Sequence, residues 1–311
     1  MKMDRPLKNM ADSVRQRLLN VAKERREDYQ LILTRYSLER LMYRLSCSQY
    51  RREYVVKGAM VFSLWNDEPH RATRDLDLLG HGSNDLGELA KIFAEIVATP
   101  VEDDGIRFDP QSIEPERIKV DQEYEGVRLN MMAYIDSARI KLNVDIGFGD
   151  AITPKAVEMS YPGILSFPGA CLLSYPRETV IAEKFQALVA LGIANSRLKD
   201  FYDIWFLASK FNFSGQELAK ALQATFGRRH TPLPASTPLG LTEEFAQDKN
   251  KLVQWQGFIR RTGVEGQEFG EVIKVLHSFL MPPSQAIAQG KFFDKKWLTE
   301  GVWVKESEDE G

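Results

Sequence analysis

The chain has 311 residues, 43% hydrophobic and 27% charged, which is enough for two domains with sizeable cores. That composition excludes collagen-like and low-complexity proteins, and two well-separated cysteines, Cys47 and Cys171, exclude a disulfide framework and a zinc site. Because no apolar run approaches the ~18 residues of a membrane helix and the N-terminus lacks the apolar core of a secretory signal, we expect a cytoplasmic protein with no membrane partner.

Charge is unevenly distributed, although the net charge is only −3. Residues 1–52 hold 13 Lys and Arg against 6 Asp and Glu, whereas residues 53–150 hold 10 against 20. A basic segment beside an acidic one suits a polyanionic partner near a cation site. On charge alone, solvated faces of ordinary helices and strands are the better interpretation.

The first part of the chain, residues 10–52, is expected to be helical. Apolar residues recur there at helical spacing, as at Leu38, Leu41, Met42 and Leu45. The pattern changes to β-formers at 54–56, and this predicted strand ends at Gly58. A helix is expected to follow over residues 59–66.

The middle of the chain alternates polar and apolar residues, which predicts strands. One half-buried strand is expected at 75–80, and three antiparallel strands at 116–121, 127–134 and 139–147. An amphipathic helix is expected over 86–98.

The C-terminal part is expected to be helical. Pro176 and Gly192 frame one predicted helix, and the segment RLKDFYDIWFLASKF forms a second. Residues 227–245 are rich in Pro, Gly, Ser and Thr, which indicates a loop, and helical segments are expected to follow to about 298, before a disordered acidic tail.

These elements predict an α+β fold in three parts. A helical N-terminal arm covers 1–52, a small core with a mixed or antiparallel sheet covers 53–170, and a helical C-terminal domain covers 171–311.

The strongest local signal is the segment RATRDLDLLG. Residues i and i+2 of a strand share a face, so Asp75 and Asp77 project together. Two adjacent carboxylates repel unless a cation neutralises them, and Mg²⁺ prefers such hard oxygen ligands. Asp145, on the alternating strand KLNVDIG, is a candidate third carboxylate. The alternative is that all three are solvent-facing surface acids.

Two further groups accompany these acids. The sequence VVKGAM ends a strand at Lys57-Gly58, where a backbone could approach a phosphate, although a simple strand-to-helix turn explains it equally well. Lys184 interrupts an apolar helix, and Asp200 and Asp203 share one stripe of the next helix. A snorkelling lysine and a salt-bridged surface are the alternatives.

Five segments together resemble the AbiEii/AbiGii toxin family, which belongs to the DNA polymerase β-type nucleotidyltransferases. They occur in order over about residues 30–210: VVKGAMVFSLW, HRATRDLDLLG, KLNVDIGFG, YPRETVIAEKFQAL and RLKDFYDIWFL. The C-terminal third carries no motif of the family.

The resemblance implies roles for individual residues. Asp75, Asp77 and Asp145 would hold Mg²⁺, or Mn²⁺ in its place, and Lys184 would contact the triphosphate. Either Asp200 or Asp203 would be an additional essential acid. Further nucleotide contacts are implied at Lys57, Gly58, Ala59, Arg71 and Thr73, with Ala59 departing from the Gly or Ser usual in the superfamily.

The implied reaction is attack of a hydroxyl on the α-phosphorus of an NTP, with release of pyrophosphate. The resemblance also implies a toxin restrained by a cognate antitoxin, with an RNA acceptor, the 3′ end of tRNA. Basic residues of the arm, and a basic pair further on, could follow an RNA backbone: Arg15, Arg17, Lys23, Arg25, Arg26, Arg228 and Arg229.

Three alternatives remain open from the sequence. The nucleotide could be transferred to a protein hydroxyl or a small molecule, since only the acceptor pocket would differ. The fold could instead serve as a non-catalytic nucleotide-binding module. A D-x-D glycosyltransferase is more remote, because the helical residues 1–52 do not resemble a nucleotide-sugar-binding domain.

Overall fold

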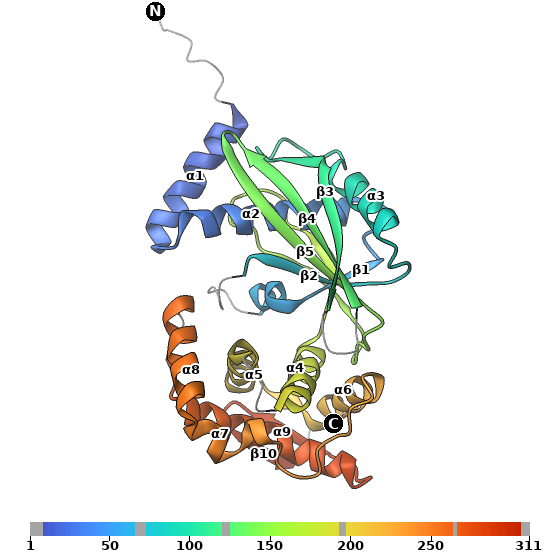
Figure 1. The fold of residues 1–311 in the computed structure, drawn as a ribbon, viewed down its shortest axis with the longest axis vertical. Coiled ribbons are helices and arrows are strands. Elements are labelled where there is room, and N and C mark those ends of the chain that lie inside the picture. Colours follow the sequence, from blue (N-terminus) through green and yellow to red (C-terminus); the bar gives the residue numbers. More distant parts are fainter. Residues whose placement is uncertain (1–8, 66–72, 120–124, 193–196, 264–265, 306–311) are drawn as a thin grey trace, which may run out of the picture. The chain divides into compact units, whose positions relative to one another are not determined.

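The computed structural model describes residues 9–65, 73–119, 125–192, 197–263 and 266–305. The chain forms two compact units. The sheet unit comprises Met1–Gly149 with Val157–Ser174, and the helical unit comprises Asp150–Ala156 with Tyr175–Gly311. The expected α+β class is confirmed, since a seven-stranded mixed sheet is combined with helices (Figure 1).

The sheet unit contains three α-helices, one 3₁₀ helix and seven strands among its described residues. In chain order they are α1 (Met10–Arg25), α2 (Tyr29–Cys47), β1 (Tyr54–Lys57), η1 (Gly58–Leu64), β2 (Asp75–Gly80), α3 (Leu86–Val97), β3 (Arg107–Lys119), β4 (Glu125–Ile135), β5 (Ala138–Phe148), β6 (Val157–Ser160) and β7 (Cys171–Ser174).

The strands are ordered β3-β4-β5-β2-β1-β7-β6 across the sheet. Neighbouring strands run antiparallel except at β2–β5 and β1–β7, which are parallel. Because β2 lies between β1 and β5, its residues have neighbours from two separate segments of the sequence.

One face of the sheet is packed and the other is more open. On β5, Ile140, Leu142, Val144 and Ile146 are fully buried, while the positions between them are partly or fully exposed. Helix α2 lies across the packed face and contacts β5 and β7 (Figure 1). This alternation is the period-two pattern expected of a sheet with one buried face.

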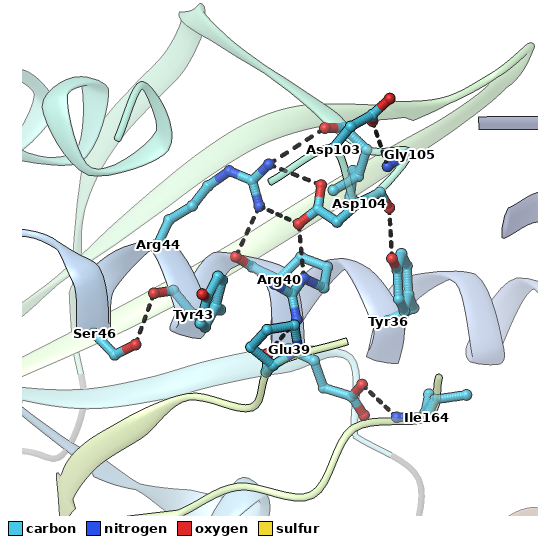
Figure 2. Close-up of polar contacts among 12 residues, drawn as sticks. Tyr36, Glu39, Arg40, Tyr43, Arg44, Ser46, Asp103, Asp104, Gly105 and Ile164 are labelled. Atoms are coloured by element: carbon cyan, nitrogen blue, oxygen red, sulfur yellow. Dashed lines mark hydrogen bonds and ion pairs between the residues drawn. The ribbon is translucent and has the colours of Figure 1, made fainter. Parts of the chain in front are cut away.

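A buried ionic network joins α2 to the loop before β3. Arg40 and Arg44, one helical turn apart, both donate to the carboxylate of Asp104, at 2.7 and 2.8 Å (Figure 2). Tyr36 donates to the backbone carbonyl of Asp104 at 2.6 Å, and Glu39 accepts from the backbone N–H of Ile164 at 2.9 Å. The pKa of Asp104 is lowered, because hydrogen bonds and charge from Arg44 and Arg40 outweigh its desolvation.

Several elements of the sheet unit differ from the sequence-based expectation. The helix expected at 59–66 is the 3₁₀ helix η1. Strand β3 begins at Arg107 rather than at 116, with a register shift between Asp109 and Glu114 that breaks the alternation. Strands β6 and β7 were not expected, because each has only four residues and neither shows the run of β-formers that marked the equally short β1.

The helical unit contains six α-helices, one 3₁₀ helix and three short strands within the part of the chain that the structure describes. They are α4 (Arg177–Leu191), α5 (Leu198–Lys210), β8 (Phe213–Ser214), α6 (Gly215–Arg228), η3 (Leu239–Leu241), α7 (Glu243–Gln247), α8 (Lys249–Thr262), α9 (Phe269–Ala288), β9 (Lys295–Leu298) and β10 (Val302–Lys305). The strands form a sheet in the order β10-β9-β8.

The expectation of helix to about residue 298 was wrong at its end. Strands β9 and β10 form a hairpin, whose Trp297 and Trp303 lie 4.8 and 5.8 Å, between ring centroids, from Phe279 of α9. This aromatic packing stabilises strands in a segment too short for its alternation to stand out. The expected disordered tail at 306–311 lies outside the described residues. Among the described helices, none is both long and apolar enough to cross a membrane.

Candidate active site

A row of charged side chains crosses five strands on the open face of the sheet. The register places Lys57 of β1 beside Asp77 of β2, and Asp77 beside Asp145 of β5. The row continues through Arg128 of β4 to Glu116 of β3. We call these five residues the charged row. The sequence predicted that Asp77 and Asp145 come from different strands, and pairing of β2 with β5 makes them direct neighbours.

Asp75 lies on the same face, two residues before Asp77. Its neighbour on β5 is Asn143, whose side-chain N–H donates to the Asp75 carboxylate at 3.1 Å. The carbonyl oxygen of the Asn143 side chain is buried and has no hydrogen-bond partner. An oxygen acceptor is thus left unsatisfied beside a carboxylate, which is unfavourable unless a cation or a donor binds there.

The carboxylate of Asp145 is held by Arg128. The guanidinium donates two hydrogen bonds, from Nε to Oδ1 and from Nη2 to Oδ2, each of 2.7 Å. The pKa of Arg128 is raised, chiefly by these hydrogen bonds. Such a bidentate pair fixes the plane of the carboxylate as well as its position. Arg128 was not among the residues that the sequence singled out, because its partner is on a neighbouring strand.

Gly58 leaves room for the carboxylate of Asp77. The backbone of Gly58 has a φ of +68°, and a Cβ built there would lie 1.8 Å from Oδ2 of Asp77. Any other residue at this position would therefore collide with one of the candidate metal ligands and would also adopt a strained backbone. The observed role of Gly58 is steric, and its expected contact with a phosphate stays a prediction.

The other candidate nucleotide contacts are only partly described. Lys57 and Ala59 are half-buried on either side of Gly58. Thr73 donates its hydroxyl to the backbone carbonyl of Asp75 at 3.1 Å, at the start of β2. Arg71 lies outside the described residues.

The oxygen donors at this place are the kind that Mg²⁺ prefers. Asp75, Asp77 and the side-chain carbonyl of Asn143 come from two adjacent strands. Across the described part of the chain, no group of three or more His, Cys, Asp or Glu side chains is placed to hold a metal ion. Since Asp145 is engaged by Arg128, the proposed three-carboxylate site stays a prediction, while Asp75, Asp77 and Asn143 fit a cation by their chemistry.

The second group of candidate residues lies in the helical unit. Lys184 of α4 contacts carboxylate oxygens of both Asp200 and Asp203 of α5, at 2.7 Å each. Arg197 contacts the other oxygen of Asp200 at 3.1 Å. The side chains of Asp200 and Asp203 are 2% and 0% exposed, so the alternative of a salt-bridged surface stripe is wrong. Because Lys184 lies equally close to both carboxylates, these distances do not show which of the two is the additional essential acid.

The sequence matches the family described as "Nucleotidyl transferase AbiEii toxin, Type IV TA system" over residues 40–278. That match covers more than half of the chain. The chain belongs to this family. It is therefore a nucleotidyltransferase of a toxin–antitoxin family, as its five motifs predicted, and the family is of type IV.

Two solved structures are also similar to this AbiEii-family chain. One is JHP933 from Helicobacter pylori, with 14% identity, 88% of this chain and 93% of that chain covered, and a TM-score of 0.44. The other is an H. pylori protein provisionally described as a nucleotidyltransferase, with 14% identity, 88% and 96% covered, and a TM-score of 0.43. We infer nothing about function from similarity this low. No curated protein matches the chain.

The helical unit contains a second polar network, which the sequence did not predict. Arg229 donates to the carboxylate of Asp150 at 3.0 Å and to the side-chain carbonyl of Gln186 at 2.9 Å. Glu183 lies 3.6 Å from the same guanidinium and accepts from the hydroxyl of Tyr175 at 3.0 Å. Burial and the charge of Glu183 raise the pKa of Tyr175.

These contacts correct one expectation about RNA binding. Arg229 is only 7% exposed, so it is a buried structural residue and cannot follow an RNA backbone. Arg228 beside it is exposed. On the arm, Arg17 is half-buried and lies over the ring of Phe167, whereas the other basic residues considered are exposed: Arg15, Lys23, Arg25 and Arg26.

Proposed function

We propose that this nucleotidyltransferase transfers a nucleotide from an NTP to an RNA acceptor, the 3′ end of tRNA, with Mg²⁺ and release of pyrophosphate. The observation that carries the proposal is the register of β2 and β5, which sets Asp77 beside Asp145 with Asp75 on the same face. Family membership supports the nucleotide substrate. The RNA acceptor rests on the family resemblance and on the basic residues of the arm.

Asp75 and Asp77 are proposed to hold the metal ion, with the unpartnered side-chain oxygen of Asn143 as a further metal ligand. A bound Mg²⁺, or Mn²⁺, would supply positive charge to the phosphates. Gly58 keeps the space that the carboxylate of Asp77 occupies, and Asn143 holds the carboxylate of Asp75.

Asp145 is proposed to take the proton from the acceptor hydroxyl. The hydroxyl oxygen then forms a bond to the α-phosphorus, the bond from that phosphorus to the bridging oxygen breaks, and pyrophosphate leaves. Arg128 would act as a positioning residue, because its two hydrogen bonds fix the orientation of Asp145.

Lys184 is proposed to contact the phosphates of the nucleotide, where a lysine would offset negative charge on the leaving group. Its two contacts with Asp200 and Asp203 show that this ammonium already lies among carboxylates. A phosphate contact would therefore require Lys184 to share or exchange a partner. Asp200 and Asp203 are proposed to position Lys184.

The cognate antitoxin is the expected protein partner, since the family belongs to type IV toxin–antitoxin systems. We propose that it is encoded beside the toxin.

The transfer is tested by incubating the protein with Mg²⁺, total tRNA and each of the four labelled NTPs in turn. We expect label in the tRNA with one or more NTPs, and none with Asp75→Ala, because removal of one carboxylate leaves the cation site incomplete. Asp12→Ala, an exposed acid on α1, is the matched control and should label tRNA as the unchanged protein does.

The results also separate the alternatives. Label in a protein band or a small molecule, but not in tRNA, would contradict the proposal that the acceptor is RNA. NTP binding that depends on Mg²⁺ without any turnover would contradict the transfer itself. Full activity in Asp75→Ala, with an unchanged circular dichroism spectrum, would contradict the assigned role of Asp75.

A further inference from the structure

The open face of the sheet continues beyond the charged row toward the turn between β4 and β5. Residues alternate along β5, so Lys141 and Arg139 lie on the same face as Asp145. The register places Tyr134 of β4 beside Arg139, and Arg107 of β3 beside Tyr134. We call Arg107, Tyr134, Arg139 and Lys141 the basic strip.

The basic strip is accessible on the sheet unit. Arg107, Arg139 and Lys141 are exposed and Tyr134 is half-buried, whereas the alternate positions of β4 and β5 point into the core. Strands β4 and β5 form one long hairpin (Figure 1). Alternation along β5 places Arg139 and Lys141 on the same face as Asp145. The strip is thus continuous with the face that carries the candidate catalytic carboxylates.

The spacing between the strip and Asp145 follows from strand geometry. At about 3.3 Å per residue, Lys141 lies roughly 13 Å and Arg139 roughly 20 Å along β5 from Asp145. That separation suits a chain of a few nucleotides whose end reaches the carboxylates.

The strip combines the two features by which single-stranded nucleic acid is bound. Cations contact the phosphates, and aromatic or guanidinium planes stack on bases. The guanidinium of Arg107 lies over the Tyr134 ring, 4.3 Å from its centroid, so the pair presents a flat surface for stacking. Arg139 and Lys141 supply two positive charges beside it.

The charges around the strip favour a polyanion. Residues 53–150 hold 20 acidic residues against 10 basic ones, yet three of those basic residues gather on this strip. Of the nearby acids, Asp136 in the turn is paired with Arg15 at 3.0 Å, which offsets its negative charge. The ion pair with Asp136 also places a basic residue of α1 beside the hairpin.

We propose that the basic strip binds the single-stranded 3′ segment of the RNA acceptor and directs its terminal hydroxyl toward Asp145. This inference rests on the proposed function, because it assumes an RNA acceptor. It adds a binding surface on the sheet to the exposed basic residues of the arm.

The test is binding of the full-length protein to a labelled single-stranded RNA of about 12 nucleotides, followed by fluorescence anisotropy over a range of salt concentrations. For the double variant Arg139→Gln/Lys141→Gln we expect affinity to fall about 10-fold and the salt dependence to weaken by about 1.4 in the log–log slope, as for two lost phosphate contacts. For Tyr134→Leu, which removes the stacking plane and keeps apolar volume, we expect a loss between ~5-fold and ~150-fold.

The matched control removes the same charge from the same unit. Arg117→Gln/Lys91→Gln changes two exposed residues, one on β3 at an alternate position and one on α3, and should bind RNA as the unchanged protein does. NTP affinity should be unaltered in every variant, because no strip residue is the register partner of a candidate metal ligand.

Failure of the strip and failure of the proposed function give different results. If the unchanged protein labels tRNA and the strip variants keep its KM for tRNA, the proposed role of the basic strip is wrong and the proposed function stands. An equal loss of RNA affinity in the control also overturns the proposed role of the strip, since the loss would then come from the lower net positive charge and not from the position of these residues. If the unchanged protein neither binds nor labels RNA, the proposed acceptor fails, and the strip fails with it.

Discussion

At the scale of single residues, the candidate site is defined by partners that the sequence did not reveal. Asp75 and Asp77 share a face as strand alternation predicts, but Asn143, Arg128 and Gly58 determine how the carboxylates are held. Each of these acts from another segment of the chain. Sequence spacing can place two acids on one strand, whereas their neighbours depend on which strands pair.

Glu39 on α2 provides a pH-dependent prediction at this scale. Burial raises the pKa of its carboxyl from 4.5 to about 7, against the opposing effects of the Ile164 hydrogen bond, Arg35 and Arg40. Between these values the folded state keeps a proton that the unfolded state has lost, so folding stability falls as pH rises toward 7. Above pH 7, the folded protein carries the full destabilisation that comes from burying the ionised Glu39 carboxylate.

Glu39→Gln keeps an oxygen to accept from Ile164 and removes the charge (Figure 2). We expect the variant to be more stable than the unchanged protein at pH 8, by at most about 3 kcal/mol, with no difference near pH 4.5. Urea unfolding at several pH values measures this. Glu24→Gln, which changes an exposed acid on α1, is the control. A Glu39→Gln protein that is less stable at pH 8 would contradict the assignment.

At the scale of elements, α4 and α5 are joined through Lys184 and two buried acids. Lys184→Ala leaves the carboxylates of Asp200 and Asp203 facing each other, with Arg197 still beside Asp200. Removing one partner of a buried ionic group typically costs 3–5 kcal/mol, so we expect a loss of about that size in the free energy of unfolding. Lys220→Ala, an exposed lysine on α6, is the control.

The double variant Lys184→Ala/Asp203→Asn distinguishes charge balance from simple loss of packing. It removes the negative charge of one of the two buried carboxylates that Lys184 contacts, so we expect it to recover part of the stability lost in Lys184→Ala. Urea unfolding of the single and double variants measures the coupling. Equal stability of Lys184→Ala and the unchanged protein would contradict the buried network. If Lys184→Ala loses transfer activity, its free energy of unfolding must therefore be measured before the loss is assigned to a missing phosphate contact.

Elements with a long, regular pattern were predicted well from the sequence. Helices α2 and α5 and strands β2, β4 and β5 were expected near their observed positions from the spacing of their apolar residues, and α4 from the Pro176 and Gly192 that frame it. Strands β6, β7 and β9, of four residues each, were not expected, although the equally short β1 was, and of β3 only the part after its register shift was expected. Burial of Asp200, Asp203 and Arg229 also escaped prediction, since charged residues are assumed to be exposed until their partners are known.

At the scale of the whole molecule, the chain passes between its two units more than once. Residues 150–156 belong to the helical unit, and the chain then returns to add β6 and β7 to the sheet. The sequence analysis placed a boundary at 170, but β7 begins at Cys171 and pairs with β1 through Val56 and Ser174. The last strand of the sheet unit would thus be separated from its sheet by a cut at 170.

Fragments of the chain test where the sheet unit ends. We expect fragment 1–174 to unfold cooperatively and fragment 1–170 to be less stable, because β1 becomes an edge strand and the fully buried Leu172 is lost. Burial of a leucine is worth about 1.5–3 kcal/mol, which corresponds to a fall in Tm of roughly 5–10 °C. Thermal unfolding followed by circular dichroism measures the difference.

Fragment 1–178 is the control for chain length, since it adds four residues that belong to the helical unit. It should melt within about 2 °C of fragment 1–174, because the added residues contribute no strand to the sheet. If all three fragments melt together, β7 contributes nothing to the sheet unit and the boundary at 170 is adequate. If only 1–174 and 1–178 melt cooperatively, the unit that carries Asp75, Asp77 and Asp145 requires a strand that follows them by about 25 residues or more in the sequence, because β7 supports β1 and β1 supports β2.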